Sequence, residues 1–212
     1  MKLPDNLKED FSQGALDADT LSKDPFEQFE RWFSEICEID PDAPNAVSLA
    51  TASGLGVPSV RTVLMKIYDL NGFVFFTNYT SRKSAELLAT KKAAFVIHWK
   101  SLRRQVRVVG SVTQTGAAES DAYFATRSRA SQIGAWASDQ SSALATRQQL
   151  MDKVAEFDAA YPDGVPRPPH WGGFVVSPQE IEFWADGDAR LHYRFRYLRN
   201  EAALWQAQRL SP

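Results

Sequence analysis

The chain has 212 residues, and 24 Lys and Arg against 26 Asp and Glu give it a formal charge of −2. This length predicts one domain or two small ones, and 44% apolar residues are enough for a real core. A slightly acidic protein lacks the net basic field that binds nucleic acids or anionic membranes, so we expect neither as a partner. The single cysteine, Cys37, excludes an intrachain disulfide and any site with several thiolate ligands.

Nothing in the sequence predicts export or a membrane span. Charged residues follow the first methionine at once, and the longest apolar run, 93–97, is far shorter than the roughly 20 residues that a spanning helix needs. We therefore expect a soluble protein in the cytoplasm, where a lone thiol stays reduced. The three histidines are scattered along the chain, so we expect no metal site.

The first half of the chain predicts one helix followed by strands. Residues 1–23 are polar and weakly patterned, and we interpret them as a mobile arm before a single domain over 24–212. Asp24, Pro25 and Glu27 form a helix-start signal, and apolar residues then recur at helical spacing to about Cys37. Alternating residues predict strands at 46–51, 60–66 and 72–77, joined by two hairpin turns. A helix at 81–90 and strands at 93–99 and 104–113 follow.

The second half predicts helices at 117–126 and 141–159, a proline-rich loop at 162–169, and strands near 173–184, 190–197 and 203–209. Most strands are linked as hairpins with helices between them. This order predicts an α+β fold, a mainly antiparallel β-barrel with inserted and flanking helices. The segment 54–56 lacks the third glycine of a dinucleotide-binding fingerprint, and strands do not alternate with helices, so we do not expect a parallel Rossmann sheet.

Two clusters of cations predict sites for anions. Arg82 and Lys83 stand in the first turn of a predicted helix, where they oppose the helix dipole unless an anion offsets them. Tyr123, Arg127 and Ser131 are spaced i, i+4 and i+8, which keeps them on one face if the helix runs that far. Such a stripe can grip a phosphate. A solvated basic turn and an exposed Arg beside a half-buried Tyr are the ordinary alternatives.

The segment 190–197 alternates cations with apolar residues, so strict alternation sends the two sets to opposite faces of a strand. The cations are Arg190, His192, Arg194 and Arg196, and the core residues are Leu191, Tyr193, Phe195 and Tyr197. A plain solvated strand face is the alternative to an anion site here. With no nucleotide-binding loop in the sequence, the three clusters together favour small phosphorylated ligands held by side chains, with more than one phosphate.

A series of short stretches is more specific than any of these clusters: 61–66 (RTVLMK), 76–78 (FTN), 81–83 (SRK), 104–106 (RQV), 131–136 (SQIGAW), 140–142 (QSS), 171–174 (WGGF), 181–184 (IEFW) and 190–194 (RLHYR). With this series the chain resembles the pyridoxine (pyridoxamine) 5′-phosphate oxidase family along nearly its whole length. The resemblance implies an FMN-binding split β-barrel and a homodimer with two active sites at the subunit interface. It also implies oxidation of pyridoxamine or pyridoxine 5′-phosphate by O₂ to pyridoxal 5′-phosphate and H₂O₂.

The resemblance further implies roles for individual residues. The FMN contacts would be Arg61, Thr62, Val63, Leu64, Met65, Lys66, Phe76, Thr77, Arg82, Lys83, Gln105, Gln140, Ser141, Trp184 and Arg194. The substrate phosphate would be bound by Lys66, Tyr123, Arg127 and Ser131. Arg190 and His192 would flank the substrate ring at the reacting carbon as the catalytic pair.

The sequence departs from the family pattern in two places. Tyr193 stands where the family has an acidic or small polar residue, and Lys8 and Phe11 are nearest to an Arg and a Tyr of an N-terminal lid. Two alternatives stay open: a paralogous FMN oxidase of the phenazine-biosynthesis type, and a non-catalytic module that binds flavin or pyridoxal phosphate. The phosphate-binding stripe argues against the first alternative. The presence of both Arg190 and His192 argues against the second.

Overall fold

The computed structural model describes residues 16–212. They fold as two compact units: unit 1 holds residues 16–47, 95–108 and 179–212, and unit 2 holds residues 48–94 and 109–178. Lys8, Phe11 and the rest of 1–15 lie outside the described residues. The last residues of the predicted arm pack in unit 1, where Leu16 and Ser22 are buried and the Tyr197 hydroxyl donates to the Ser22 carbonyl. A single domain over 24–212 stays a prediction.

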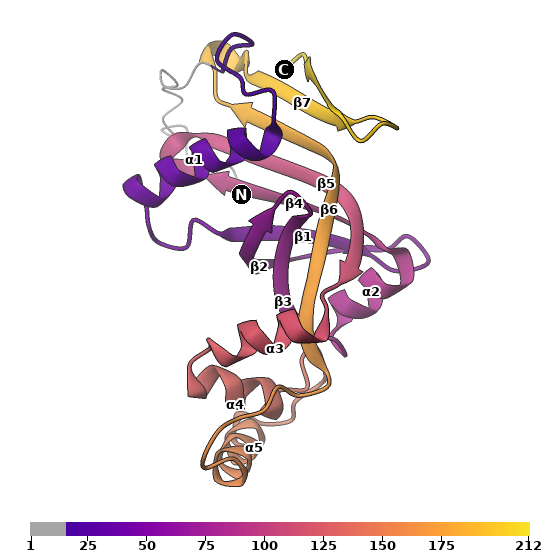
Figure 1. Ribbon diagram of the computed structural model, residues 1–212. Coiled ribbons are helices and arrows are strands. Elements are labelled where there is room, and N and C mark those ends of the chain that lie inside the picture. Colours follow the sequence, from indigo (N-terminus) through magenta and orange to yellow (C-terminus); the bar gives the residue numbers. More distant parts are fainter. Residues whose placement is uncertain (1–15) are drawn as a thin grey trace, which may run out of the picture. The chain divides into compact units, whose positions relative to one another are not determined.

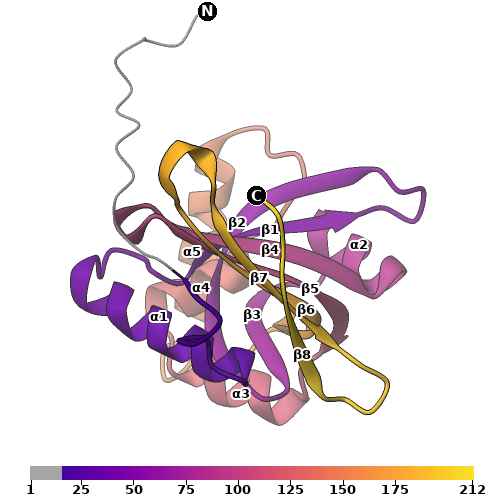
Figure 2. The ribbon, with the colours of Figure 1, turned by 90° about the horizontal axis from the view of Figure 1, so that it is seen from above.

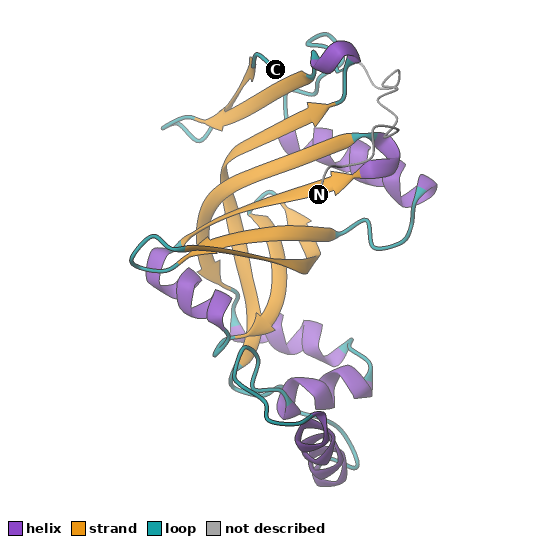
Figure 3. Ribbon diagram, turned by 180° about the vertical axis from the view of Figure 1, so that it is seen from behind, coloured by secondary structure: helices purple, strands orange, loops and turns teal. Residues whose placement is uncertain are grey.

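Within the described residues, eight strands form one sheet in the order β3-β2-β1-β4-β5-β6-β7-β8, and a further pairing of β3 with β6 closes the first six into a barrel (Figures 1 and 3). The strands are β1 (Ala46–Ala52), β2 (Pro58–Asp69), β3 (Gly72–Asn78), β4 (Lys92–Trp99), β5 (Arg104–Gln114), β6 (Trp171–Ala185), β7 (Tyr193–Arg199) and β8 (Trp205–Arg209). The predicted α+β fold with a mainly antiparallel barrel is confirmed.

In unit 2, strand β3 is held between β2 and β6, and Phe75 of β3 lies opposite Phe174 of β6 with ring centroids 5.9 Å apart. The unit also contains α2 (Arg82–Thr90), α3 (Ala117–Ala125), α4 (Arg129–Ala137) and α5 (Arg147–Ala160). Figure 1 shows α3, α4 and α5 grouped at the same end of β3. The strand β3 therefore extends from the core of the unit to the end at which these three helices lie.

In unit 1, α1 (Pro25–Ile39) starts as its sequence predicts, because the Asp24 side chain accepts a hydrogen bond from Phe26 N at 2.7 Å. The apolar face of α1 is buried, and the ring of Trp32 meets that of Phe183 edge to face at 5.2 Å. Strands β7 and β8 form the closing hairpin of the same unit (Figure 2). Of the helices in the described part of the chain, none is both long and apolar enough to cross a membrane.

The structure corrects three of the predicted elements. Helix α4 was not predicted, although Ser128 supplies its N-cap by accepting from Ser131 N. The helix predicted at 141–159 begins only at Arg147, after the cap Thr146. The strand predicted at 190–197 begins at Tyr193, because residues 188–190 form a 3₁₀ turn in which Arg190 has φ 64°, a left-handed conformation that ends an extended strand.

Candidate functional site

Unit 2 contains a cavity of about 1050 Å³, lined by residues of β2, β3, α2, α3 and α4 and of the segments next to these helices. Cavities that bind small molecules usually measure about 300–1,000 Å³, so this one has room for more than one small ligand. Most of the predicted cofactor and substrate residues contribute to its lining: Arg61, Thr62, Val63, Leu64, Lys66, Phe76, Thr77, Arg82, Lys83, Tyr123, Arg127, Ser131, Gln140 and Ser141.

The charged side chains that line this cavity all carry positive charge: Arg61, Lys66, Arg82, Lys83 and Arg127. Among residues 16–212, no carboxylate lines it. Gathering like charges in a concave, partly dry site is unfavourable unless an opposite charge offsets them. The cavity is therefore complementary to anionic ligands, and the donor set fits phosphate groups.

Lys83 is the most buried of these cations. Its side chain reaches from the first turn of α2 to Thr77 Oγ1 at 3.1 Å and Ser81 Oγ at 3.2 Å, and it also donates to the Gln140 side chain. All of these partners are neutral. Burial, with a smaller contribution from the charge of Arg61, lowers the pKa of Lys83 from 10.5 to about 8. An anion bound beside this ammonium would restore its ordinary protonation.

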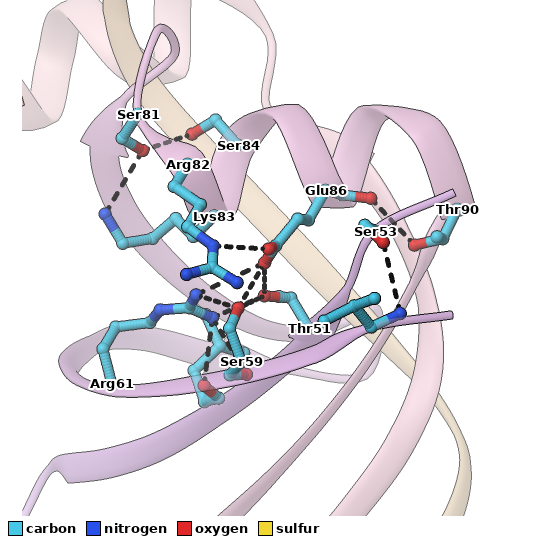
Figure 4. Close-up of polar contacts among 12 residues, drawn as sticks. Thr51, Ser53, Ser59, Arg61, Ser81, Arg82, Lys83, Ser84, Glu86 and Thr90 are labelled. Atoms are coloured by element: carbon cyan, nitrogen blue, oxygen red, sulfur yellow. Dashed lines mark hydrogen bonds and ion pairs between the residues drawn. The ribbon is translucent and has the colours of Figure 1, made fainter. Parts of the chain in front are cut away.

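Arg61 and Arg82 are held by a shared carboxylate, that of Glu86 on α2 (Figure 4). Arg82 Nε lies 2.9 Å from Glu86 Oε1, and Arg61 Nη2 lies 3.3 Å from Glu86 Oε2. The hydroxyls of Thr51 and Ser59 also donate to this carboxylate. Sequence reasoning missed Glu86, although its spacing of four residues from Arg82 on the predicted helix is a signal for an ion pair. Its other partners, on β1 and β2, lie far away along the chain.

Aromatic rings support the other part of the lining. The Tyr123 ring stacks on that of Phe76 with centroids 3.9 Å apart, and the Arg127 guanidinium lies 4.7 Å from the centre of the Trp171 ring. Burial lowers the pKa of Arg127, while the neighbouring Tyr123 raises it. Arg127 Nη1 is buried without a hydrogen-bond partner in the described chain. A buried guanidinium N–H of this kind is a donor that an anion could satisfy.

Tyr123, Arg127 and Ser131 line one cavity, but not as one helical stripe. Helix α3 ends at Ala125, Arg127 lies in the turn that follows, and Ser131 belongs to α4. The Ser128 side chain stabilises the turn, because it donates to Ser131 Oγ at 2.9 Å and accepts from Ser131 N. The prediction of a shared site is therefore compatible with the structure, but its condition, a helix that runs on to Ser131, is not met.

The remaining predicted residues do not line this cavity in the described chain. Met65 is only 4% exposed and belongs to the core of unit 2. The others belong to unit 1: Gln105, Trp184, Arg190, His192 and Arg194.

Arg194 and Arg196 do not form the unpaired row of cations that alternation predicts. Arg194 Nε lies 2.8 Å from Glu182 Oε1, and Arg107 also pairs with Glu182. Arg196 lies 3.9 Å from Glu180. These acids stand on β6, the neighbouring strand, which a reading of one segment cannot show. Leu191 is 68% exposed rather than in the core, since the strand begins after it.

His192 has an acidic partner that the sequence did not reveal. Its Nδ1 lies 2.9 Å from Asp186 Oδ1, and its ring lies 4.7 Å from that of Trp184. Asp186 is buried, accepts from Gly187 N and lies 3.9 Å from Arg103. The two groups are close enough for an ion pair, but within the described chain Nδ1 makes no hydrogen bond, so the carboxylate lies beside the ring without fixing it.

Two family models cover most of the chain. Residues 37–161 match the model described as pyridoxamine 5′-phosphate oxidase, and residues 171–212 match the model described as the pyridoxine 5′-phosphate oxidase C-terminal dimerisation region. The second model includes Trp184, Arg190, His192 and Arg194. Both models thus fall on the residues that carry the candidate site.

Curated relatives agree with the family models. The pyridoxine/pyridoxamine 5′-phosphate oxidase of Paraburkholderia xenovorans is 47% identical over 207 residues, which are 97% of each chain. The enzyme of the same description from Cereibacter sphaeroides is 50% identical over 190 residues, 89% of this chain and 95% of its own.

Solved structures show the same fold. PhzG from Burkholderia lata, crystallised in complex with tetrahydrophenazine-1-carboxylic acid, has a TM-score of 0.89 and 31% identity, with 95% of this chain and 99% of that chain covered. A pyridoxamine 5′-phosphate oxidase-related, FMN-binding protein from Nostoc punctiforme has a TM-score of 0.71 at 16% identity, with 91% and 100% covered.

Proposed function

Because the chain belongs to the pyridoxamine 5′-phosphate oxidase family, we infer that it oxidises pyridoxamine or pyridoxine 5′-phosphate to pyridoxal 5′-phosphate. O₂ is the electron acceptor and H₂O₂ the second product, and the amine substrate also takes up water and releases ammonia. The observation that supports this function best is the cavity of unit 2, whose charged side chains are all cations. A flavin and a phosphorylated substrate together need such a site.

The protein is a flavoprotein of this family, and we propose that its flavin is FMN. The phosphate of FMN would be bound by Arg61, Arg82 and Lys83, at the start of α2. Ser141 and Gln140 lie beside them in the lining and would add polar contacts. When bound, the flavin supplies the acceptor for the hydride that leaves the substrate.

We propose that Lys66, Tyr123, Arg127 and Ser131 bind the substrate phosphate. Arg127 brings an unpaired buried N–H, and its guanidinium makes a cation–π contact with Trp171 at 4.7 Å from the ring centre. A phosphate fixed at this end would hold the reacting carbon in one place, and such positioning can lower a barrier by several kcal/mol. The chain's main contribution is therefore alignment and electrostatics.

We further propose that the protein acts as a homodimer in which the cavity of one subunit is completed by the C-terminal segment of the other. This segment, 171–212, matches a region described as a dimerisation region and carries Arg190 and His192. His192, with Asp186 beside its Nδ1, and Arg190 would flank the substrate ring.

The phenazine-biosynthesis type of oxidase is the second candidate, because PhzG shares the fold over almost the whole chain. It is less well supported, since the curated relatives at 47–50% identity are described as pyridoxine/pyridoxamine 5′-phosphate oxidases. A clamp made of Lys66, Arg127 and Ser131 also has no purpose for a substrate without a phosphate. A non-catalytic binding module would leave the pairing of His192 with Asp186 without a role.

A spectroscopic experiment tests this function. The purified protein should be yellow, and anaerobic addition of pyridoxamine 5′-phosphate should bleach its absorbance near 450 nm. Admission of O₂ should restore the absorbance and yield pyridoxal 5′-phosphate and H₂O₂ in equal amounts. A flavin that binds but is not reduced would contradict the enzyme and favour the binding module.

A further inference from the structure

A buried carboxylate lies directly behind two of the cavity's arginines. Glu86 is 5% exposed and is not part of the lining, yet Arg61 and Arg82, which both line the cavity, pair with it at 3.3 and 2.9 Å. Figure 4 shows the two guanidinium groups approaching the carboxylate from different elements, β2 and α2. Glu86 thus connects two cations that lie twenty-one positions apart in the sequence.

Glu86 stays ionised over the whole physiological range. Burial alone would raise its pKa, but hydrogen bonds from two hydroxyls and from Arg82 lower it to about 2. The hydroxyls belong to Thr51 and Ser59, and both also accept from Arg61. The carboxylate, the two hydroxyls and the Arg61 guanidinium therefore form one closed network in which the Arg61 side chain has little freedom to move.

The network leaves donors available to a ligand. Arg82 is bound through Nε, and no hydrogen bond within the described chain uses its terminal nitrogens. The ammonium of Lys83 follows Arg82 in the same turn of α2. The three cations and the one carboxylate leave a net charge of about +2, which matches a phosphate monoester, whose charge near pH 7 is about −1.5 to −2.

We propose that Glu86 is a positioning residue for phosphate recognition, which holds Arg61 and Arg82 in the geometry that binds the phosphate of the flavin. The proposal rests on the proposed function, because it takes the start of α2 as the FMN phosphate site. Glu86 acts through the two arginines and does not touch the ligand. Its role is to limit the freedom of long side chains that would otherwise have to be ordered when the ligand binds.

Charge and positioning predict opposite results for Glu86→Gln. This substitution removes a negative charge close to the phosphate site, so electrostatics alone would strengthen the binding of FMN. Positioning predicts the reverse, since the neutral amide is a poor acceptor for two guanidinium groups and brings a competing donor. The affinity for riboflavin, which has the same ring without the phosphate, should hardly change. The FMN-to-riboflavin affinity ratio therefore separates the two effects.

The experiment titrates flavin-free, full-length protein with FMN and with riboflavin and follows the flavin fluorescence. For Glu86→Gln we expect the dissociation constant of FMN to rise about ten-fold, the change associated with one charge-assisted hydrogen bond. The constant for riboflavin should stay within about two-fold. Glu86→Asp keeps the charge, but its shorter side chain moves the carboxylate away from the two arginines. The dissociation constant of FMN should therefore rise in this variant as well. The exposed Glu156→Gln is the charge-matched control and should match wild type.

Circular dichroism and a thermal melt of each flavin-free variant establish that it is folded. If Glu86→Gln does not fold, Thr51→Val is tested in its place. Thr51→Val removes one hydroxyl of the network, so it should weaken the binding of FMN but not that of riboflavin. Unchanged or tighter FMN binding in a folded variant would overturn the proposal while the proposed function stands. Equal affinity of the wild type for FMN and riboflavin would instead overturn the assignment of the phosphate site, and the proposal with it.

Discussion

Lys83 is buried and donates only to neutral partners, which makes its protonation sensitive to pH. Its pKa of about 8 lies below the ordinary 10.5, so the flavin-free protein loses this charge as the pH rises through 8. The unfolded chain keeps its proton up to about pH 10.5. Between about pH 8 and 10.5 the unfolded state therefore binds more protons than the folded state. The free energy of unfolding of the flavin-free protein should increase with pH over this range and should be lower below pH 8.

The affinity for FMN should follow the opposite trend. If the phosphate of FMN binds the ammonium of Lys83, as we propose, the dissociation constant should be flat up to about pH 7.5 and rise by as much as ten-fold per unit above pH 8. Titrations at pH 7 and 9.5 measure this change. Lys83→Ala should bind FMN at least about ten-fold more weakly at pH 7 and should lose the pH dependence. A variant that matched wild type at both pH values would place the phosphate elsewhere.

Arg127 should affect the substrate and not the flavin. Arg127→Ala removes the buried unpaired N–H and the cation–π contact with Trp171, so KM for pyridoxamine 5′-phosphate should rise about ten-fold or more. Steady-state kinetics and the flavin content of the purified variant measure the two effects. Arg127→Lys keeps the charge but not the planar fork, and it should recover only part of the loss. Loss of flavin from Arg127→Ala would contradict the separation of the two phosphate sites.

Sequence patterns identified the cations of the site but not the acids that hold them. An anion site at Arg82 and Lys83 could be predicted, because two cations in the first turn of a helix are repelled by the positive end of the helix dipole unless an anion binds there. Asp186 could not, since nothing local distinguishes it from other acids, and for Glu86 only the i, i+4 spacing from Arg82 was readable in the sequence. Their roles depend on contacts with Arg61 and His192 that exist only once the strands are paired. The alternation over 190–197 is confirmed for Phe195 and Tyr197, which are buried, but it could not show that Glu182 pairs with Arg194 from another strand.

At the scale of elements, turn chemistry decided where prediction succeeded. The hairpin between β2 and β3 was predicted from Asp69 and Gly72, and the structure places the Asp69 side chain as an acceptor for Asn71 N and Gly72 N. The end of α3 was predicted correctly to within one residue, but α4 was not predicted. Only the cap formed by Ser128 marks the new start.

Gly72 gives a test of the β2–β3 hairpin. It has φ 140°, and a Cβ at this position would lie 2.2 Å from the Val176 carbonyl oxygen on β6. Gly72→Ala should therefore cost about 1–3 kcal/mol or more and lower Tm by roughly 4 °C or more. Gly54→Ala in the β1–β2 hairpin is the matched control, since nothing lies within 4 Å of its added Cβ. Equal Tm values for the two variants would contradict the pairing of β3 with β6.

At the scale of the whole molecule, the pattern of hairpin-linked strands was enough to predict an antiparallel barrel, but not the pairings of β1 with β4 and of β3 with β6, which join strands far apart in the chain. The division of the site residues between two units was not predictable. Residues such as Arg127 line the cavity of unit 2, whereas Arg190 and His192 belong to unit 1 and to the segment that matches a dimerisation region. The proposed homodimer gives both groups a place in one site.

Mixed dimers test this arrangement. Arg127→Ala and His192→Ala each lack one part of the site, so at substrate concentrations well below KM each alone should keep about a tenth or less of the wild-type activity. If each site takes one part from each subunit, half of a random mixture is mixed dimers with one intact site, and about one quarter of wild-type activity should return. The assay needs refolding or co-expression to exchange the subunits. Recovery of no activity, with mixed dimers demonstrated by mass, would show that both parts act within one subunit.

The central claim is that a cationic cavity selects a phosphorylated substrate for oxidation by O₂. The most direct measurement is the ratio of kcat/KM for pyridoxamine 5′-phosphate to that for pyridoxamine, obtained from O₂ uptake by the wild-type protein. One charged phosphate gripped by several charge-assisted hydrogen bonds should give a ratio of about 100 or more, and the ratio should fall in Arg127→Ala. Equal efficiency on the two amines would contradict the account.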